Sequence, residues 1–140
     1  MSKQFEDALM EIQSGLISLC LEATGKEIEK VYAYASIEKG MKTFNAFYQR
    51  GNAIASLRQL GAGASLIRSF LTESVKDLEK LELLCREMNR PCPCEIKIIY
   101  NVHTGAFDSD MKYESVCGPD ADTTPGQVFM EWMKSAKEKT

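Results

Sequence analysis

The sequence predicts an α+β fold in which an antiparallel sheet of four to five strands packs with three helices, in the order α-β-β-(β)-α-β-β-α. Residues 3–23 and 65–88 repeat apolar side chains every three or four positions, the period of a helix with one buried side. Residues 29–49 and 95–114 instead alternate apolar and polar side chains, the period of a strand. Because the strands come in groups and do not alternate singly with helices, the pattern favours this class over a doubly wound parallel sheet.

Length and composition fit a single domain over residues 1–140. A chain of 140 residues with 44% hydrophobic and 26% charged residues is typical of a globular protein with a sizeable core. No apolar run approaches the roughly 20 residues of a membrane span, and acidic residues follow the first lysine where a signal peptide would be apolar. We therefore expect a cytoplasmic protein without membrane association. Its five cysteines are an odd number, which predicts reduced thiols.

The first half of the chain predicts a helix followed by a small meander. The helix over residues 3–23 ends at Thr24-Gly25, because glycine suits the left-handed geometry of a helix end, and Cys20 lies on its apolar side. Residues 29–37 and 41–49 predict two strands joined by a turn, and residues 53–57 predict a short third one. The glycine-rich segment 61–65 breaks the sheet and lacks the phosphate-loop pattern, so we expect no nucleotide site there.

Two more helices are expected. The helix over residues 65–88 stops before Pro91, and the last helix begins after Thr124, with Gln127 placed to close a capping box. The predicted buried stripe of the longer helix is Leu66, Phe70, Leu78, Leu81, Leu84, Cys85 and Met88, widened in its first half by Leu71 and Val75. The predicted inner stripe of the last helix is Val128, Phe129, Trp132 and Ala136.

The stretch from Glu95 to Glu114 predicts an antiparallel hairpin with one polar face. Its first arm places Ile96, Ile98 and Tyr100 on one side, and the segment 103–105 supplies a turn with glycine. On the second arm, Phe107, Ser109, Met111 and Tyr113 alternate with Asp108, Asp110, Lys112 and Glu114. One face of this arm is therefore expected to meet the core, and the other to show carboxylates to water.

The charges are distributed unevenly along the chain. Residues 1–60 carry seven acidic and seven basic side chains, whereas residues 101–133 carry six acidic side chains and one basic one, Lys112. Such an imbalance disfavours a nucleic-acid surface and favours a basic protein partner. The alternative is a solvated acidic face with no partner.

Several residue clusters have the types needed for chemistry, but their spacing does not favour an enzyme. Cys85, Cys92, Cys94, Cys117 and His103 offer a zinc alternative, although one residue separates Cys92 from Cys94 where zinc sites usually have two to four. His103 falls in a predicted turn. Asp108 and Asp110 alternate outward like a surface ladder and unlike a catalytic pair facing a pocket. Trp132 and Tyr113 are expected to anchor the core, with an interface role as the alternative.

Several strings together resemble the YezG-like immunity proteins, small bacterial antitoxins that neutralise secreted polymorphic toxins. The similar features are EKVYAYASIEKG, TFNAFYQ, a long mixed-charge helix, the hairpin IKIIYNVHTGAFDSDMKYE and a final helix with Trp132. The resemblance implies a protein without catalytic activity or cofactor that binds a cognate toxin domain, commonly a nuclease.

Under this resemblance the acidic side chains would occupy the basic cleft of the toxin and steer its association. The expected partner-binding residues are Asp108, Asp110, Glu114, Asp120 and Asp122, with Tyr113 and Tyr34 as aromatic contacts. The alternative function is that of a small cytosolic zinc-binding or regulatory interaction protein that uses Cys92 and Cys94. The sequence leaves the oligomeric state open.

Overall fold

The computed structural model describes residues 2–24, 27–38, 41–114 and 124–139, and it confirms the predicted order of elements. The elements are α1 (Ser2–Thr24), β1 (Lys30–Glu38), β2 (Met41–Arg50), β3 (Ala53–Ser56), α2 (Ala64–Glu87), β4 (Glu95–Asn101), β5 (Phe107–Lys112) and α3 (Pro125–Lys139). Their bounds fall close to those predicted from the sequence. The fold is therefore α+β, with three helices and a five-stranded antiparallel sheet.

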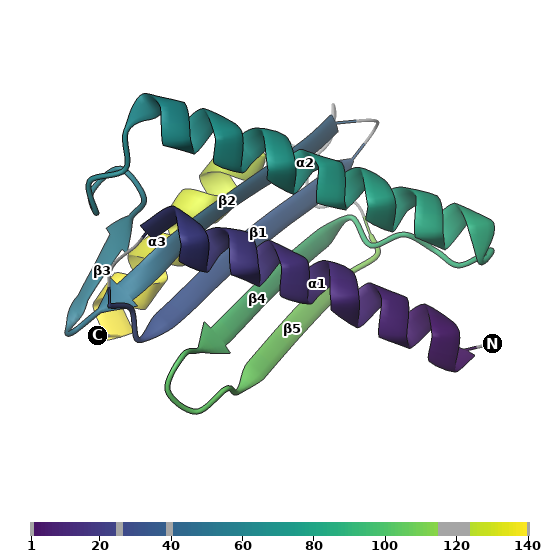
Figure 1. Cartoon of the computed structure of the whole chain (residues 1–140), viewed down its shortest axis with the longest axis horizontal. Coiled ribbons are helices and arrows are strands. Elements are labelled where there is room, and N and C mark those ends of the chain that lie inside the picture. The colour runs from purple at the N-terminus through teal and green to yellow at the C-terminus, as the bar shows by residue number, and fades with distance from the viewer. Residues whose placement is uncertain (1, 25–26, 39–40, 115–123, 140) are drawn as a thin grey trace.

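The strands lie in the order β3-β2-β1-β4-β5, and every neighbouring pair is antiparallel. Figure 1 shows α1 and α2 side by side across one face of the sheet, and α3 on the opposite face behind β2 and β3. The chain is thus built in three layers, with β1 at the centre of the sheet and β5 at one of its edges.

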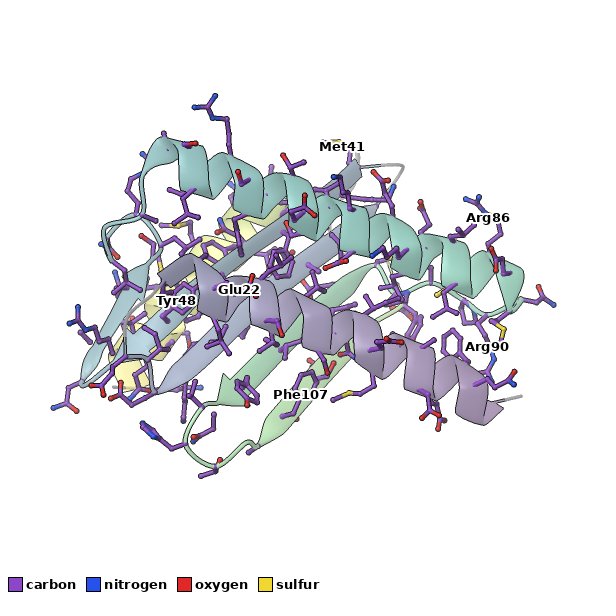
Figure 2. The ribbon with its side chains drawn as sticks, in the orientation of Figure 1. Glu22, Met41, Tyr48, Arg86, Arg90 and Phe107 are labelled. Carbon is purple, nitrogen blue, oxygen red and sulfur yellow. The ribbon has the colours of Figure 1, made fainter. Side chains whose placement is uncertain are left out.

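The face under α1 and α2 holds the larger core. The side of β1 that faces these helices carries Val31 and small alanines, which let the helices approach closely. Leu16, Leu78 and Leu81 of the two helices are fully buried against this surface. The phenol of Tyr48 reaches up from β2 and donates a hydrogen bond of 2.9 Å to the backbone carbonyl of Cys20 in α1. Figure 2 shows Tyr48 beneath the last turns of α1.

A second aromatic core lies between the sheet and α3. The rings of Tyr32 and Phe47 stack with their centroids 4.5 Å apart, and Trp132 of α3 meets both of them edge-on. Phe129 fills the space beside Tyr34 and Phe47. Because helices cover both faces of β1, its residues 31–37 are all buried, which differs from the half-buried strand that alternation alone predicts.

The buried side of α2 differs in part from the predicted stripe. The buried residues are Phe70, Ser74, Leu78, Leu81 and Cys85, whereas Leu66 and Leu71 are 45% and 39% exposed. Leu71 is turned about 100° from Phe70 on a helix of 3.6 residues per turn, so both cannot face the sheet. The hydroxyl of Ser74 is satisfied by the carbonyl of Leu71 at 2.9 Å, which allows a polar residue to stand in the apolar stripe.

Local contacts define the boundaries of several elements at the positions that the sequence predicts. The hydroxyl of Thr124 accepts a hydrogen bond from the N–H of Gln127, and the Gln127 side chain accepts one from the N–H of Thr124, which completes the predicted capping box of α3. Between β4 and β5, Gly105 has a φ of +76°, a conformation that glycine adopts without strain. Arg90, which follows the end of α2, contacts the first turns of α1 (Figure 2). Its guanidinium lies 4.8 Å from the centroid of the Phe5 ring.

Candidate functional site

Among the residues that the structure describes, the single helix α3 covers only part of its face of the sheet. It contacts β2 and β3, and it does not extend over β5 (Figure 1). At its border, the ammonium of Lys97 in β4 lies 5.5 Å from the centroid of the Trp132 ring. We call the uncovered surface the open face; it consists of the α3-side residues of two strands, namely Lys97, Ile99 and Asn101 of β4 and Asp108, Asp110 and Lys112 of β5.

Strand register decides how the charges of the open face meet. Asp110 lies directly opposite Lys97, and Asp108 lies opposite Ile99. Both aspartates are exposed, as predicted, and the hairpin itself is confirmed. The sequence prediction missed Lys97, because the cross-strand partner of a side chain follows only from the register. The predicted carboxylate ladder is therefore interleaved with lysines.

The two lysines of the open face are both directed toward groups of the protein. Lys97 stands over Trp132, and the ammonium of Lys112 is 3.6 Å from Oε2 of Glu95. Glu95 is 2% exposed, and its Oε1 has no hydrogen-bond partner among the described residues, where Lys112 is the group that compensates its charge. Asp108 and Asp110 make no ion pair with any residue that the structure describes. The charges of the open face that have no ion pair within the described residues are therefore those of Asp108, Asp110 and Lys97, which together are negative by one unit.

A shallow groove of about 390 Å³ continues the open face along α3. Ile99 and Trp132 form its wall next to the open face, and Lys30 and Lys139 are part of its lining. Its described lining contains no carboxylate or thiol. Within the described ranges, no group of three or more His, Cys, Asp or Glu side chains is close enough to hold a metal ion. The arrangement offers a binding surface and no assembled acid–base or metal centre among the described residues.

The structure places the predicted contact residues unequally. Asp108, Asp110 and Glu114 are exposed on or directly after β5. Tyr113 is 51% exposed and its hydroxyl contacts the sulfur of Met111 at 3.7 Å, so it is a surface residue and the expectation of a core anchor is wrong. The reason is that β5 ends at Lys112, after which strand alternation no longer orients side chains.

Of the other predicted contact residues, one is buried and two lie outside the residues that the structure describes. Tyr34 is 1% exposed, because β1 is the central strand and α3 covers its ring, so it is removed from the candidate contact residues. Asp120 and Asp122 lie outside the residues that the structure describes. Trp132 belongs to the core between α3 and the sheet, as expected, while part of it borders the groove and the open face.

The cysteines that the structure describes do not form the site that the zinc alternative requires. Cys92 and Cys94 precede β4 and are not in a strand, and the Cys94 thiol is directed to the carbonyl of Tyr113 at 3.5 Å. Burial raises the pKa of Cys92 to about 12, and the neighbouring Cys85 adds to this shift. Burial also raises the pKa of Cys94. In the metal-free protein these thiols therefore stay protonated near neutral pH.

The predicted zinc cluster has two further members. His103 is exposed in the turn between β4 and β5, and Cys117 lies outside the described residues. Cys20 is buried beside Tyr48, and burial raises its pKa, in agreement with the predicted core role.

Neither models of known protein families nor curated protein sequences give a match to this chain. The resemblance to the YezG-like immunity proteins therefore stays a prediction from the sequence. None of the helices that the structure describes has a stretch long and apolar enough to cross a membrane.

Proposed function

We propose that this chain is an immunity protein that binds and neutralises a cognate secreted toxin domain in the cytoplasm. The toxin is a nuclease in this proposal, and the open face covers its basic active-site cleft. The protein itself catalyses no reaction. The resemblance to the YezG-like immunity proteins supplies the class of partner, and the geometry of β4 and β5 supplies the surface.

The observation that carries the proposal is the pair of exposed carboxylates on β5. Asp108 and Asp110 project from a strand that is fixed in the sheet, and neither has an ion pair within the described residues. Keeping two like charges side by side on a rigid element favours a partner that brings the opposite charge. Nuclease clefts are basic because they bind phosphates. Fixed carboxylates attract such a cleft and accelerate the association of the nuclease with this chain.

The neighbouring side chains support contact with a folded protein. Tyr113 and Glu114 follow the strand directly and are exposed, and aromatic residues are enriched in protein interfaces. The groove beside Trp132 and Ile99 adds apolar surface next to the charges. Among the described residues this surface is acidic, partly apolar and without an assembled catalytic centre, which fits an inhibitor better than an enzyme.

The first test is co-purification. We expect the neighbouring upstream reading frame to encode a large secreted protein with a variable C-terminal domain, and we expect that domain to co-purify with this chain and to lose its activity in the complex. A C-terminal domain that neither binds this chain nor is inhibited by it contradicts the proposal.

The second test locates the surface with a charge reversal. The double variant Asp108→Lys/Asp110→Lys is expected to slow association with the toxin domain about tenfold at low salt, because steering by fixed charges depends on their sign. The matched control is Glu79→Lys/Glu87→Lys on α2, which changes the net charge equally at two exposed positions on the other side of the sheet. Equal effects of the two double variants on the association rate would remove the open face from the proposal.

A further inference from the structure

The outer side of β5 carries backbone groups that pair with no described strand. β5 pairs with β4 on one side, and no strand pairs with its other side among the residues that the structure describes. The N–H of Asn101 donates to the carbonyl of Ala106 at 2.9 Å, which sets the phase of the antiparallel ladder. The peptide groups of Asp108, Asp110 and Lys112 therefore face β4, and those of Phe107, Ser109 and Met111 face outward.

The two rows of side chains along this edge differ in chemistry. On the α3 side the row consists of Asp108 and Asp110, followed by Lys112. On the α1 side it consists of Phe107, Ser109 and Met111, which are partly buried (Figure 2 labels Phe107). A strand laid beside β5 would meet carboxylates with one of its faces and mainly apolar side chains with the other.

Helix α1 extends the apolar row beyond the strand. The hydroxyl of Ser109 and Oε1 of Gln13 are 2.6 Å apart, which fixes the side of α1 that lies over β5. Met10 is one turn before Gln13 on that side and is 42% exposed. An added strand would thus find an apolar side chain above it as well as beside it.

We propose that β5 accepts an extended segment of the partner, in which basic and apolar residues alternate, as a sixth strand of the sheet. The inference rests on the proposed function and names the part of the partner that is recognised. The outward N–H and C=O groups of β5 bind the backbone of the segment, and its basic residues face Asp108 and Asp110. Because the row ends at Lys112, the segment carries no base opposite that position.

A second copy of this chain fits the edge less well than a basic segment. Antiparallel pairing of two β5 strands centred on Ser109 places Asp108 of each copy opposite Asp110 of the other. Pairing centred on Asp110 opposes the two Asp110 side chains, although it also places Asp108 of each copy opposite Lys112 of the other. Like charges directly opposite one another destabilise a sheet, whereas a lysine or arginine opposite each aspartate stabilises it.

Peptides test the inference without the toxin. The probe is a capped peptide of about seven residues that alternates lysine and valine, long enough to span a strand of ordinary length. Titrated into the ¹⁵N-labelled protein, it is expected to shift the amide signals of the β5 region and to slow hydrogen exchange of Phe107, Ser109 and Met111. A peptide that alternates glutamate and valine is the control and is expected to leave them unchanged. Equal shifts with both peptides, or none at millimolar peptide, overturn the inference.

A proline variant tests whether the peptide binds through backbone hydrogen bonds to β5 or only through the side chains of β5. Ser109→Pro removes an outward N–H, a change that edge strands tolerate, and is expected to weaken peptide binding at least about tenfold. Ser109→Ala removes the same hydroxyl but keeps the N–H, and is expected to bind as the unchanged protein does. If Ser109→Pro does not fold, peptides methylated at alternate backbone nitrogens replace it. Binding that survives both the proline and the methylation overturns the inference.

The outcomes distinguish this inference from the proposed function. A toxin domain that binds Ser109→Pro and Ser109→Ala equally well leaves the proposed function standing and removes the added strand. A chain that binds the lysine–valine peptide at β5 but no toxin domain supports the edge and contradicts the proposed partner. Sedimentation that shows a dimer broken by Ser109→Pro in the absence of peptide assigns the edge to a second copy and overturns the inference.

Discussion

On one face of the sheet, α1 and α2 lie side by side and bury Leu16, Leu78 and Leu81 completely; on the other, α3 is the one helix of the described residues and lies over β2 and β3. The first face is a closed interior. On the second face, aromatic rings around Trp132 fill the space under α3. The charged surface of β4 and β5 lies beside them and is exposed to solvent. The comparison indicates that the two-helix face carries most of the stability, and that the one-helix face leaves strand surface available for a partner.

The largest effect is expected from a cavity in the closed face. Leu78→Ala removes a fully buried side chain and is expected to lower the free energy of unfolding by about 3 kcal/mol. Leu83→Ala is the matched control on the same helix, because Leu83 is 49% exposed; its expected effect is within about 0.5 kcal/mol. Urea unfolding measures both. Similar losses for the two variants would contradict the assignment of the closed face as the main core.

A smaller effect is expected from the hydrogen bond between Tyr48 and α1. Tyr48→Phe loses the bond to the Cys20 carbonyl and is expected to cost about 1 kcal/mol at neutral pH. Burial raises the pKa of Tyr48, so the folded protein keeps this proton after the unfolded chain has lost it. The unfolded state then binds fewer protons, and the stability that Tyr48 contributes falls by about 1.4 kcal/mol per pH unit above roughly pH 10.

The phenylalanine ring of the Tyr48→Phe variant cannot ionise, so the difference in stability between the two proteins is expected to narrow as the pH rises above roughly 10. Urea unfolding at a series of pH values measures this difference. Parallel stability curves for Tyr48→Phe and the unchanged protein would show that the phenol ionises as freely in the folded state as in the unfolded chain.

The smallest effect is expected from the N-terminal cap of α3, the helix on the one-helix face of the sheet. Thr124→Ala removes the hydroxyl that accepts a hydrogen bond from Gln127 and is expected to cost about 1 kcal/mol or less, since the residue is exposed. Thr124→Ser keeps an accepting oxygen and serves as the control. Hydrogen exchange is expected to accelerate in α3 while α1 and α2 are unaffected. Equal acceleration in all three helices would mean that α3 does not open by itself.

The fold was predictable from the sequence because its signals are local. Alternation over residues 95–114 predicts the hairpin, and the pairing of Thr124 with Gln127 predicts where α3 begins. Helical periodicity predicts α1 and α2 and most of their buried residues. Each of these signals depends on residues a few positions apart, so no knowledge of the tertiary structure is needed.

The candidate site was predictable only in part, because its remaining features depend on contacts between distant segments. Asp108 and Asp110 follow from alternation, whereas Lys97 enters the site through the register of β4 and β5. Tyr34 is buried because β1 is the central strand, and strand order is not encoded in any single segment. Tyr113 is exposed because β5 ends at Lys112. The sequence does not show this boundary, because apolar and polar residues continue to alternate as far as Glu114.

Hydrogen exchange of the complex with the toxin domain tests the central claim most directly, because it compares both faces of the sheet in one sample. On binding, we expect slower exchange in residues 95–114, greatest at Phe107, Ser109 and Met111, with no change on the outer surfaces of α1 and α2. Protection confined to α1 and α2, with β4 and β5 unchanged, would contradict binding at the open face and at the edge of β5.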